Sequence, residues 1–238
     1  IRTSFLVFVA GLIMVLAPMK GGGVWRGWLL RDVEGIPISR IVPVVGAERA
    51  SDVLALAGLG LLGFGLYRRT VEVVLVVIGL FILVTLLLQW RTACLAILDR
   101  LDGLPLIGSY TGPLETAYED AYVLFSPRPL VVSLGLSLGA WAIEGVCIWL
   151  VLAGFGMSSP PLLSVFVFSV GSLVGGLTLL PGGLVTTEAS ITGLLLAFGF
   201  TRPIAVGTTL LVRVGTLWYG VLLGLAGYAG FRLWVADE

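Results

Sequence analysis

Long apolar runs separated by short polar stretches are the main pattern of this 238-residue sequence. Roughly 20 helical residues cross the roughly 30 Å hydrocarbon core of a bilayer, so each apolar run of about that length predicts a membrane-spanning helix. The pattern therefore predicts an all-α, polytopic transmembrane bundle of four to six spans. The expected spans are residues 51–67, 71–90, 130–155 and 162–180, with 203–231 as a fifth and 4–18 as a partial sixth.

Three polar interruptions predict how these spans connect. Residues 21–45 mix tryptophan and leucine with charged residues, which predicts a loop and an amphipathic helix at the membrane interface. Residues 91–129 combine charged residues with glycine and proline, so they predict the longest connection, a surface loop with a short helix at 114–125. Arg68 and Arg69 predict a tight turn, so the spans on either side of them should form a helical hairpin.

A short apolar segment near the C-terminal end predicts a broken helix. Residues 184–198 follow Pro181-Gly182-Gly183 and are ended by Gly199. The segment is too short to span a bilayer comfortably, and irregular backbone at membrane depth is tolerated where protein surrounds it. We therefore expect a re-entrant helix here.

The two ends of the chain share this layout, which suggests an internal repeat. In each, an apolar run ends at a proline, glycines follow, and a short helix leads to a glycine. The intervals from Gly35 to Arg49 and from Gly199 to Arg213 are both 14 residues. Paired broken helices line central sites in transporters, whereas chance matching in a glycine-rich chain is the alternative. The expected organisation is a single domain, 1–238, with repeat halves 1–90 and 130–238 and connecting segment 91–129.

Composition excludes several classes of protein. A chain with 58% hydrophobic and only 12% charged residues is not a soluble domain. The absence of histidine excludes HExxH zinc sites and serine–histidine pairs, and two distant cysteines make no metal or disulfide framework. Zero net charge without a basic patch argues against nucleic acid as a partner. We expect no cofactor and no metal. Because the first residue is Ile1, we also expect an N-terminally truncated sequence.

Two charged residues fall in the middle of expected spans. Arg213 lies ten residues into its span, a depth of roughly 15 Å, and Glu144 is also far from both ends of its own span. An unpaired arginine at the bilayer centre costs at least about 2.5 kcal/mol. The two residues therefore predict either a mutual ion pair or a polar cavity, and a pair that only fixes helix register is the alternative. Glu188 either complements the dipole of the re-entrant helix or belongs to the same site.

Two further charged groups lie near the first helix break. Glu48, Arg49 and Asp52 stand at the head of an expected span, where they form either a helix-capping cluster or one side of a charged pathway. Lys20 and Arg26 flank the break and suit a phosphate group, or else they anchor the chain to anionic lipid head groups.

Five short motifs follow one another along the chain. They are Pro18-x-Lys20 with Arg26, Glu48-Arg49-x-x-Asp52, Trp141-x-x-Glu144, Pro181-Gly182-Gly183 with Glu188, and Arg213. In this order they resemble a known family, the transmembrane, flippase-like region of lysylphosphatidylglycerol synthases and its stand-alone relatives, over nearly the whole chain. Gly23 stands where that family usually has glutamate, Val185 where glycine is common, and Thr187 where a basic residue is frequent.

The resemblance implies a multi-pass cell-membrane protein that binds and flips a lipid. In the best-known members the lipid is an aminoacylated phosphatidylglycerol, and archaeal relatives suggest polyprenyl-linked sugars. Head-group binding is expected at Lys20, Arg26, Glu48, Arg49, Asp52, Trp141, Glu144, Thr187, Glu188 and Arg213. The helix-break backbone is expected at Pro18, Gly22, Gly23, Pro181, Gly182 and Gly183.

The leading hypothesis is therefore a lipid flippase that is not an enzyme, with a phospholipid or polyprenyl-phosphate lipid as its partner. One alternative is a membrane glycosyl or phosphatidyl transferase, for which Asp99 and Asp102 form the only nearby acidic pair. Another is a non-transporting subunit that docks a neighbouring lipid-modifying enzyme through residues 91–129. A homo-oligomer is compatible with each.

Overall fold

A computed structural model describes residues 2–16, 22–61, 68–102, 111–178 and 180–236 of the chain. These residues form helices and no strand, which confirms the all-α prediction. The α-helices are α1 Arg2–Gly11, α2 Gly22–Glu34, α3 Ile38–Leu61, α4 Arg68–Gln89, α5 Arg91–Asp102, α6 Thr111–Leu124, α7 Pro127–Gly154, α8 Pro161–Leu177, α9 Thr186–Ala197, α10 Arg202–Arg213 and α11 Tyr219–Ala236. Shorter helical turns are η1 Leu12–Leu16, η4 Pro181–Gly183 and the π-helical turn η5 Val214–Trp218.

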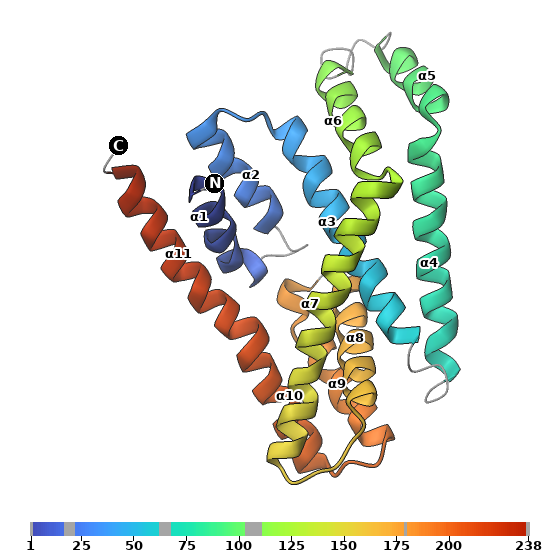
Figure 1. Ribbon diagram of the computed structural model, residues 1–238, viewed down its shortest axis with the longest axis vertical. Coiled ribbons are helices and arrows are strands. Elements are labelled where there is room, and N and C mark those ends of the chain that lie inside the picture. The colour runs from blue at the N-terminus through green and yellow to red at the C-terminus, as the bar shows by residue number, and fades with distance from the viewer. Residues whose placement is uncertain (1, 17–21, 62–67, 103–110, 179, 237–238) are drawn as a thin grey trace.

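The helices form a bundle around α3, α7 and α8, which pack against one another (Figure 1). Helix α4 packs on α3, as the predicted hairpin requires, and α9 packs on α8. Helix α11 runs along one side, with α1 and η1 against it and α2 between α1 and α3. The N- and C-terminal ends therefore lie at the same end of the molecule.

Within the described ranges, fewer helices than expected are both long and apolar enough to cross a membrane unaided. Pro127–Gly154 and Arg202–Leu233 meet both conditions, and Leu75–Gln89 with Arg91–Asp102 would make a third if this pair, bent by 70°, is one span. Phe5–Val15 and Pro161–Leu177 are apolar but shorter. Helix α3 is long enough, but Glu48, Arg49 and Asp52 interrupt its apolar run.

Three predicted boundaries are wrong. Residues 91–102, expected as surface loop, form α5, because Leu95, Leu98 and Leu101 recur every three residues on one half-buried face. Helix α3 begins at Ile38, well before the expected residue 51, and holds Pro43 inside it. Arg68 and Arg69 begin α4 rather than forming the turn, and the connection 62–67 lies outside the described residues.

The other predicted short helices are present. Helix α2 lies within the 21–45 segment and α6 matches the helix expected at 114–125. Helix α9 is the short helix expected at 184–198, and Gly199 follows it with a φ of 88°. Glycine adopts this left-handed backbone conformation without the steric strain that most other residues would have. Gly199 therefore ends helix α9.

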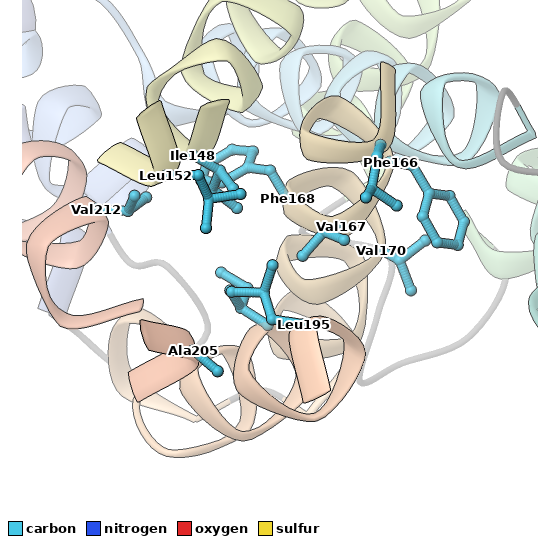
Figure 2. Packing of buried hydrophobic residues seen from close by; sticks show 11 residues of the cluster. Ile148, Leu152, Phe166, Val167, Phe168, Val170, Leu195, Ala205 and Val212 are labelled. Carbon is cyan, nitrogen blue, oxygen red and sulfur yellow. The ribbon is translucent and has the colours of Figure 1, made fainter. Parts of the chain in front are cut away.

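The main apolar core joins α7, α8, α9 and α10, and Figure 2 shows its side chains converging from these four helices. Helix α8 is the centre of this core, because every residue from Leu163 to Gly171 is buried. Fully buried members include Ile148 and Leu152 from α7, Phe166 from α8 and Leu195 from α9. The core holds the broken segment that follows α8 in a fixed position.

A glycine allows the close approach of α7 and α8. A Cβ atom on Gly145 would lie 2.7 Å from the Cα of Val165, closer than any side chain tolerates. On the same helix, a Cβ on Gly139 would meet no atom within 4 Å.

We predict that Gly145→Ala lowers the free energy of unfolding by about 1–3 kcal/mol, because α8 must move away from α7. Gly139→Ala should leave it unchanged or raise it by up to about 1 kcal/mol, since alanine favours helix and nothing obstructs it. Thermal and denaturant unfolding of the purified protein in detergent micelles would measure both. Equal stability of the two variants would show that this contact is not tight.

Candidate functional site

A cavity of about 250 Å³ lies between α1, η1, α2 and α3 on one side and α7, α8, η4, α9 and the junction of α10 with α11 on the other. The predicted site residues that line it are Gly23, Arg26, Glu48, Arg49, Trp141, Glu144, Gly182, Gly183, Thr187 and Arg213. The other residues of the cavity wall are mostly small or apolar, such as Gly11, Phe168 and Gly220.

Arg26 of α2 reaches across the cavity wall to α3. Its Nη2 atom donates to both carboxylate oxygens of Glu48, at 3.0 and 3.2 Å. Its guanidinium lies 5.2 Å from the ring centroid of Phe8, within the range of a cation–π contact. Gly11 makes room for the side chain, because a Cβ there would lie 2.3 Å from the Cγ of Arg26.

Arg49 continues this chain of charges along α3. Its guanidinium donates to the neighbouring Glu48 at 2.7 Å. It also pairs at 3.3 Å with Asp52, three residues further along and on the same helix face. The helix-capping interpretation of this cluster is wrong, because α3 begins at Ile38 and the cluster lies in its middle. Glu48 and Arg49 line the cavity instead, and the Asp52 carboxylate is directed to α7.

Asp52 connects α3 to α7. Its Oδ1 atom accepts hydrogen bonds from the Oγ of Ser137, at 3.0 Å, and from the Nε1 of Trp141, at 3.1 Å. One turn away, Ser133 donates to Ser51 at 2.9 Å. The serines were missed at the sequence level, although positions 133, 137 and 141 are spaced four apart on an otherwise apolar helix.

Arg213 forms the charged group on the opposite side of the cavity. Its Nε donates to Glu188 of α9, and its Nη2 donates to the backbone carbonyl of Gly182 at 2.7 Å. The expected pair between Arg213 and Glu144 is therefore wrong in its partner, because α9 brings Glu188 closer. Glu144 and Arg213 line the same cavity, as the polar-cavity interpretation requires.

Glu188 lies in the first turn of α9, where capping was one expectation. The N-cap residue of α9, Val185, makes no side-chain capping bond, and the carboxylate of Glu188 is directed to Arg213. Its Oε2 atom is buried and has no hydrogen-bond partner among the described residues. An acceptor of this kind in a low-dielectric setting favours a donor from a ligand.

The break before α9 is built from left-handed backbone. Gly182 and Gly183 have φ values of 59° and 64°, which glycine adopts without a steric penalty. Val185 has a φ of 72°, a strained conformation for a β-branched residue. Thr187 is buried against the break, since a Cβ on Gly175 or on Gly183 would collide with its Oγ1 atom.

Arg213 itself stands at an irregular point of the last span. Helix α10 ends at Arg213, and the π-helical turn η5 carries the chain into α11. Such π-turns rearrange the side chains around them and are frequent at functional sites. Here the turn contributes Thr216 and Leu217 to the cavity wall.

Some predicted site residues are not in the cavity wall. Lys20 and Pro18 lie outside the described residues. Gly22 begins α2 and Pro181 begins η4.

Gly23 lines the cavity, and the space where a longer side chain would start is occupied, because a Cβ there would lie 2.2 Å from the Cγ1 of Val45.

Among the described residues, positive and negative charges around the cavity are nearly equal in number. Arg26, Arg49 and Arg213 each pair with a carboxylate. Glu48 and Glu144 line the cavity, and Asp52 and Glu188 contact the arginines from beside it. Pairing offsets much of the cost of removing each charge from water. The arrangement can bind a charged group by exchange of ion-pair partners, with arginines for a phosphate and carboxylates for an amine.

Comparison with known proteins identifies relatives over nearly the whole chain. A family model described as the lysylphosphatidylglycerol synthase TM region matches residues 1–224. A UPF0104 membrane protein of Methanothermobacter thermautotrophicus is 30% identical over an alignment of 251 positions, gaps included, that covers 94% of this chain and 72% of the relative. A second protein of that description from the same organism is 24% identical over 252 residues, with the same coverage. No solved structure matches the chain at a significant level.

We predict that the pair between Arg213 and Glu188 is coupled by about 1–3 kcal/mol in a double-mutant cycle of alanine substitutions. The side chains are only 11% and 23% exposed, so either single variant leaves a charge in a poorly solvated place. Arg91 and Glu119 are the matched control, because this 2.7 Å pair joins the same residue types with 54% and 37% exposure. Unfolding in detergent would measure both cycles, and equal coupling would contradict the burial argument.

We also predict that Val185→Gly raises the free energy of unfolding by about 1 kcal/mol, because it relieves the left-handed strain. The Val185 side chain is 74% exposed, so little packing is lost. Val206→Gly, a half-exposed position within regular helix α10, should lower stability instead. A loss of stability in Val185→Gly would show that the strain is compensated.

Proposed function

Because the chain belongs to the family of the lysylphosphatidylglycerol synthase transmembrane region, we propose that it binds the charged head group of a membrane lipid in this cavity and moves it across the bilayer. The proposed substrate is a phospholipid or a polyprenyl-phosphate-linked lipid, and the proposed location is the cell membrane. The observation that carries the proposal is the convergence of three paired arginines on one cavity inside an apolar helical bundle.

The chemistry of these groups fits a phosphate-bearing head group. A guanidinium offers a planar set of donors that matches phosphate oxygens, and Arg26, Arg49 and Arg213 approach the cavity from different helices. In the absence of ligand, carboxylates hold the arginines in place. When a phosphate replaces a carboxylate, the number of ion pairs is kept, so the head group can leave water without a large penalty.

The carboxylates give the site a second capability. Glu144 faces the cavity, and Glu188 has a buried oxygen without a partner in the described part of the chain. We propose that an amine on the head group supplies a donor for the Glu188 oxygen and a positive charge beside the Glu144 carboxylate. A head group that carries both phosphate and amine therefore fits the charges of the site better than a simple anion.

Two similar ion pairs support an alternating arrangement of the cavity walls. Arg26 of α2 pairs with Glu48 of α3, and Glu188 of α9 pairs with Arg213 of α10. Each pair ties a short helix to the helix that follows it, with the charges reversed between the two halves. Both short helices are followed by a left-handed glycine, Gly35 or Gly199. We propose that residues 1–90 and 130–238 are repeats whose relative movement opens the cavity to either leaflet.

The alternative functions have less support. Asp99 and Asp102, the residues considered for a metal-dependent transferase, are exposed on α5 and do not line the cavity. In the described ranges, no three histidine, cysteine or acidic residues group as a metal site would require. Transport, rather than catalysis, is therefore the function proposed here.

The proposal predicts that Arg213→Ala abolishes lipid exchange. With the protein in liposomes, the wild type should move fluorescent phosphatidylglycerol between leaflets well above the rate of empty liposomes, and the variant should match empty liposomes. Arg202→Ala, an exposed arginine at the start of the same helix, should behave as the wild type. Chemical quenching of the outer-leaflet fluorophore would report the exchange.

A second variant separates transport from stability. Arg213→Ala leaves the Glu188 carboxylate unpaired, whereas the double variant with Glu188→Ala removes both charges and should fold better. The double variant should also fail to exchange lipid. Wild-type exchange by a folded Arg213→Ala protein would contradict the proposed function.

A further inference from the structure

We propose that a second cavity, which adjoins the charged one, holds the first part of one hydrocarbon chain of the same lipid. This inference rests on the proposed function and extends it from the head group to the chain. The second cavity has a volume of about 190 Å³ and lies between α3 and α8. Its apolar wall is formed by Val53, Leu56, Leu173, Leu177 and Leu180.

The two cavities share part of their walls. Arg49, Ser172, Gly175 and Gly176 line both, so only one arginine side chain and three small residues separate them. Arg49 is held at this boundary by Glu48 and Asp52. A phosphate bound to Arg49 would therefore place the carbon atoms attached to it beside the small residues of α8.

The cavity walls become less polar from the first cavity to the second, which matches a lipid that runs from its head group to its hydrocarbon chain. On the head-group side the wall carries the arginines and glutamates, and beyond Arg49 it is mainly valine and leucine. Leu56 and Leu173 are buried in a small apolar cluster, with Val53 packed against it. Leu177 and Leu180 are 53% and 42% exposed, so the far end of the cavity lies at the surface of the bundle. A chain that follows this path would leave toward the bilayer.

The size of the cavity limits its occupant. The cavity, at about 190 Å³, is too small for a whole lipid chain. It therefore takes the start of a single acyl or prenyl chain, and the rest of that chain lies outside. Among the described residues of this wall, Asp52 is the one acidic residue, and its carboxylate is already bound by Arg49, Ser137 and Trp141.

The test compares the binding of chain-bearing probes with that of probes that have the same phosphate group but no hydrocarbon chain. The solubilised protein is titrated with dioctanoyl phosphatidylglycerol and with chain-free glycerophosphoglycerol, and in parallel with geranyl phosphate and methyl phosphate. Each buried methylene strengthens binding about fourfold. We expect Val53→Phe, which fills the cavity, to weaken binding of the chain-bearing probe by about tenfold or more and to leave the chain-free probe unchanged.

Val42→Phe is the matched control, because it makes the same change at a 53% exposed position of the same helix. It should bind all probes as the wild type does, which also corrects for partition of the probes into micelles. The pair of probes that responds to Val53→Phe tells an acyl chain from a prenyl chain. If Val53→Phe binds both members of each pair as Val42→Phe does, the cavity is a packing void and the inference is wrong. If the wild type binds none of the four probes, the proposed function itself is overturned.

Discussion

The cost of placing a guanidinium inside an apolar helical bundle governs this structure. Each of the three cavity arginines is paired with a carboxylate from a neighbouring turn or helix, and the helices adopt positions that make those pairs. Helix α9 is short and begins after a glycine break, which brings Glu188 and the Gly182 carbonyl to Arg213. Helix α2 is brought to α3 in the same way by Arg26 and Glu48. The cavity is the space that remains between these paired groups.

Small residues allow the bundle to close around those charges. Gly145 lets α7 touch α8, Gly175 receives Thr187, and Gly11 receives Arg26. On the last helix, a Cβ on Gly224 would lie 2.2 Å from the backbone nitrogen of Ile13, so α11 and η1 meet backbone to backbone. Without a hydrophobic effect between helices in lipid, such close contacts provide much of the association energy. The many glycines of the sequence thus serve close helix packing as well as the positive-φ positions at the ends of helices.

The sequence predicted the helical class, the short helix before Gly199 and the charged residues that line the cavity, because each leaves a local mark in hydropathy or in a short motif. The partner of Arg213 was not predictable in the same way. The number of residues along a span gives the depth of a side chain in the membrane, and by depth Glu144 was the expected partner. The turn of the chain after Pro181 instead places Glu188 beside Arg213. Helix α5 was not predicted because its charged residues were taken as a sign of a loop. The regular spacing of its leucines, which indicates a helix, was given less weight. The serines that connect α3 and α7 give no signal beyond their spacing.

The central claim is that the paired arginines form a head-group site, and the lipids that accompany the purified protein test it most directly. Mass spectrometry of lipids bound to the wild type and to the double variant Arg213→Ala, Glu188→Ala, both extracted from the same membranes, would give their identity. The account predicts that a phosphate-bearing lipid is enriched over its share of the membrane in the wild type and falls to that share in the variant. A wild-type lipid composition equal to that of the bulk membrane, unchanged in the variant, would contradict it.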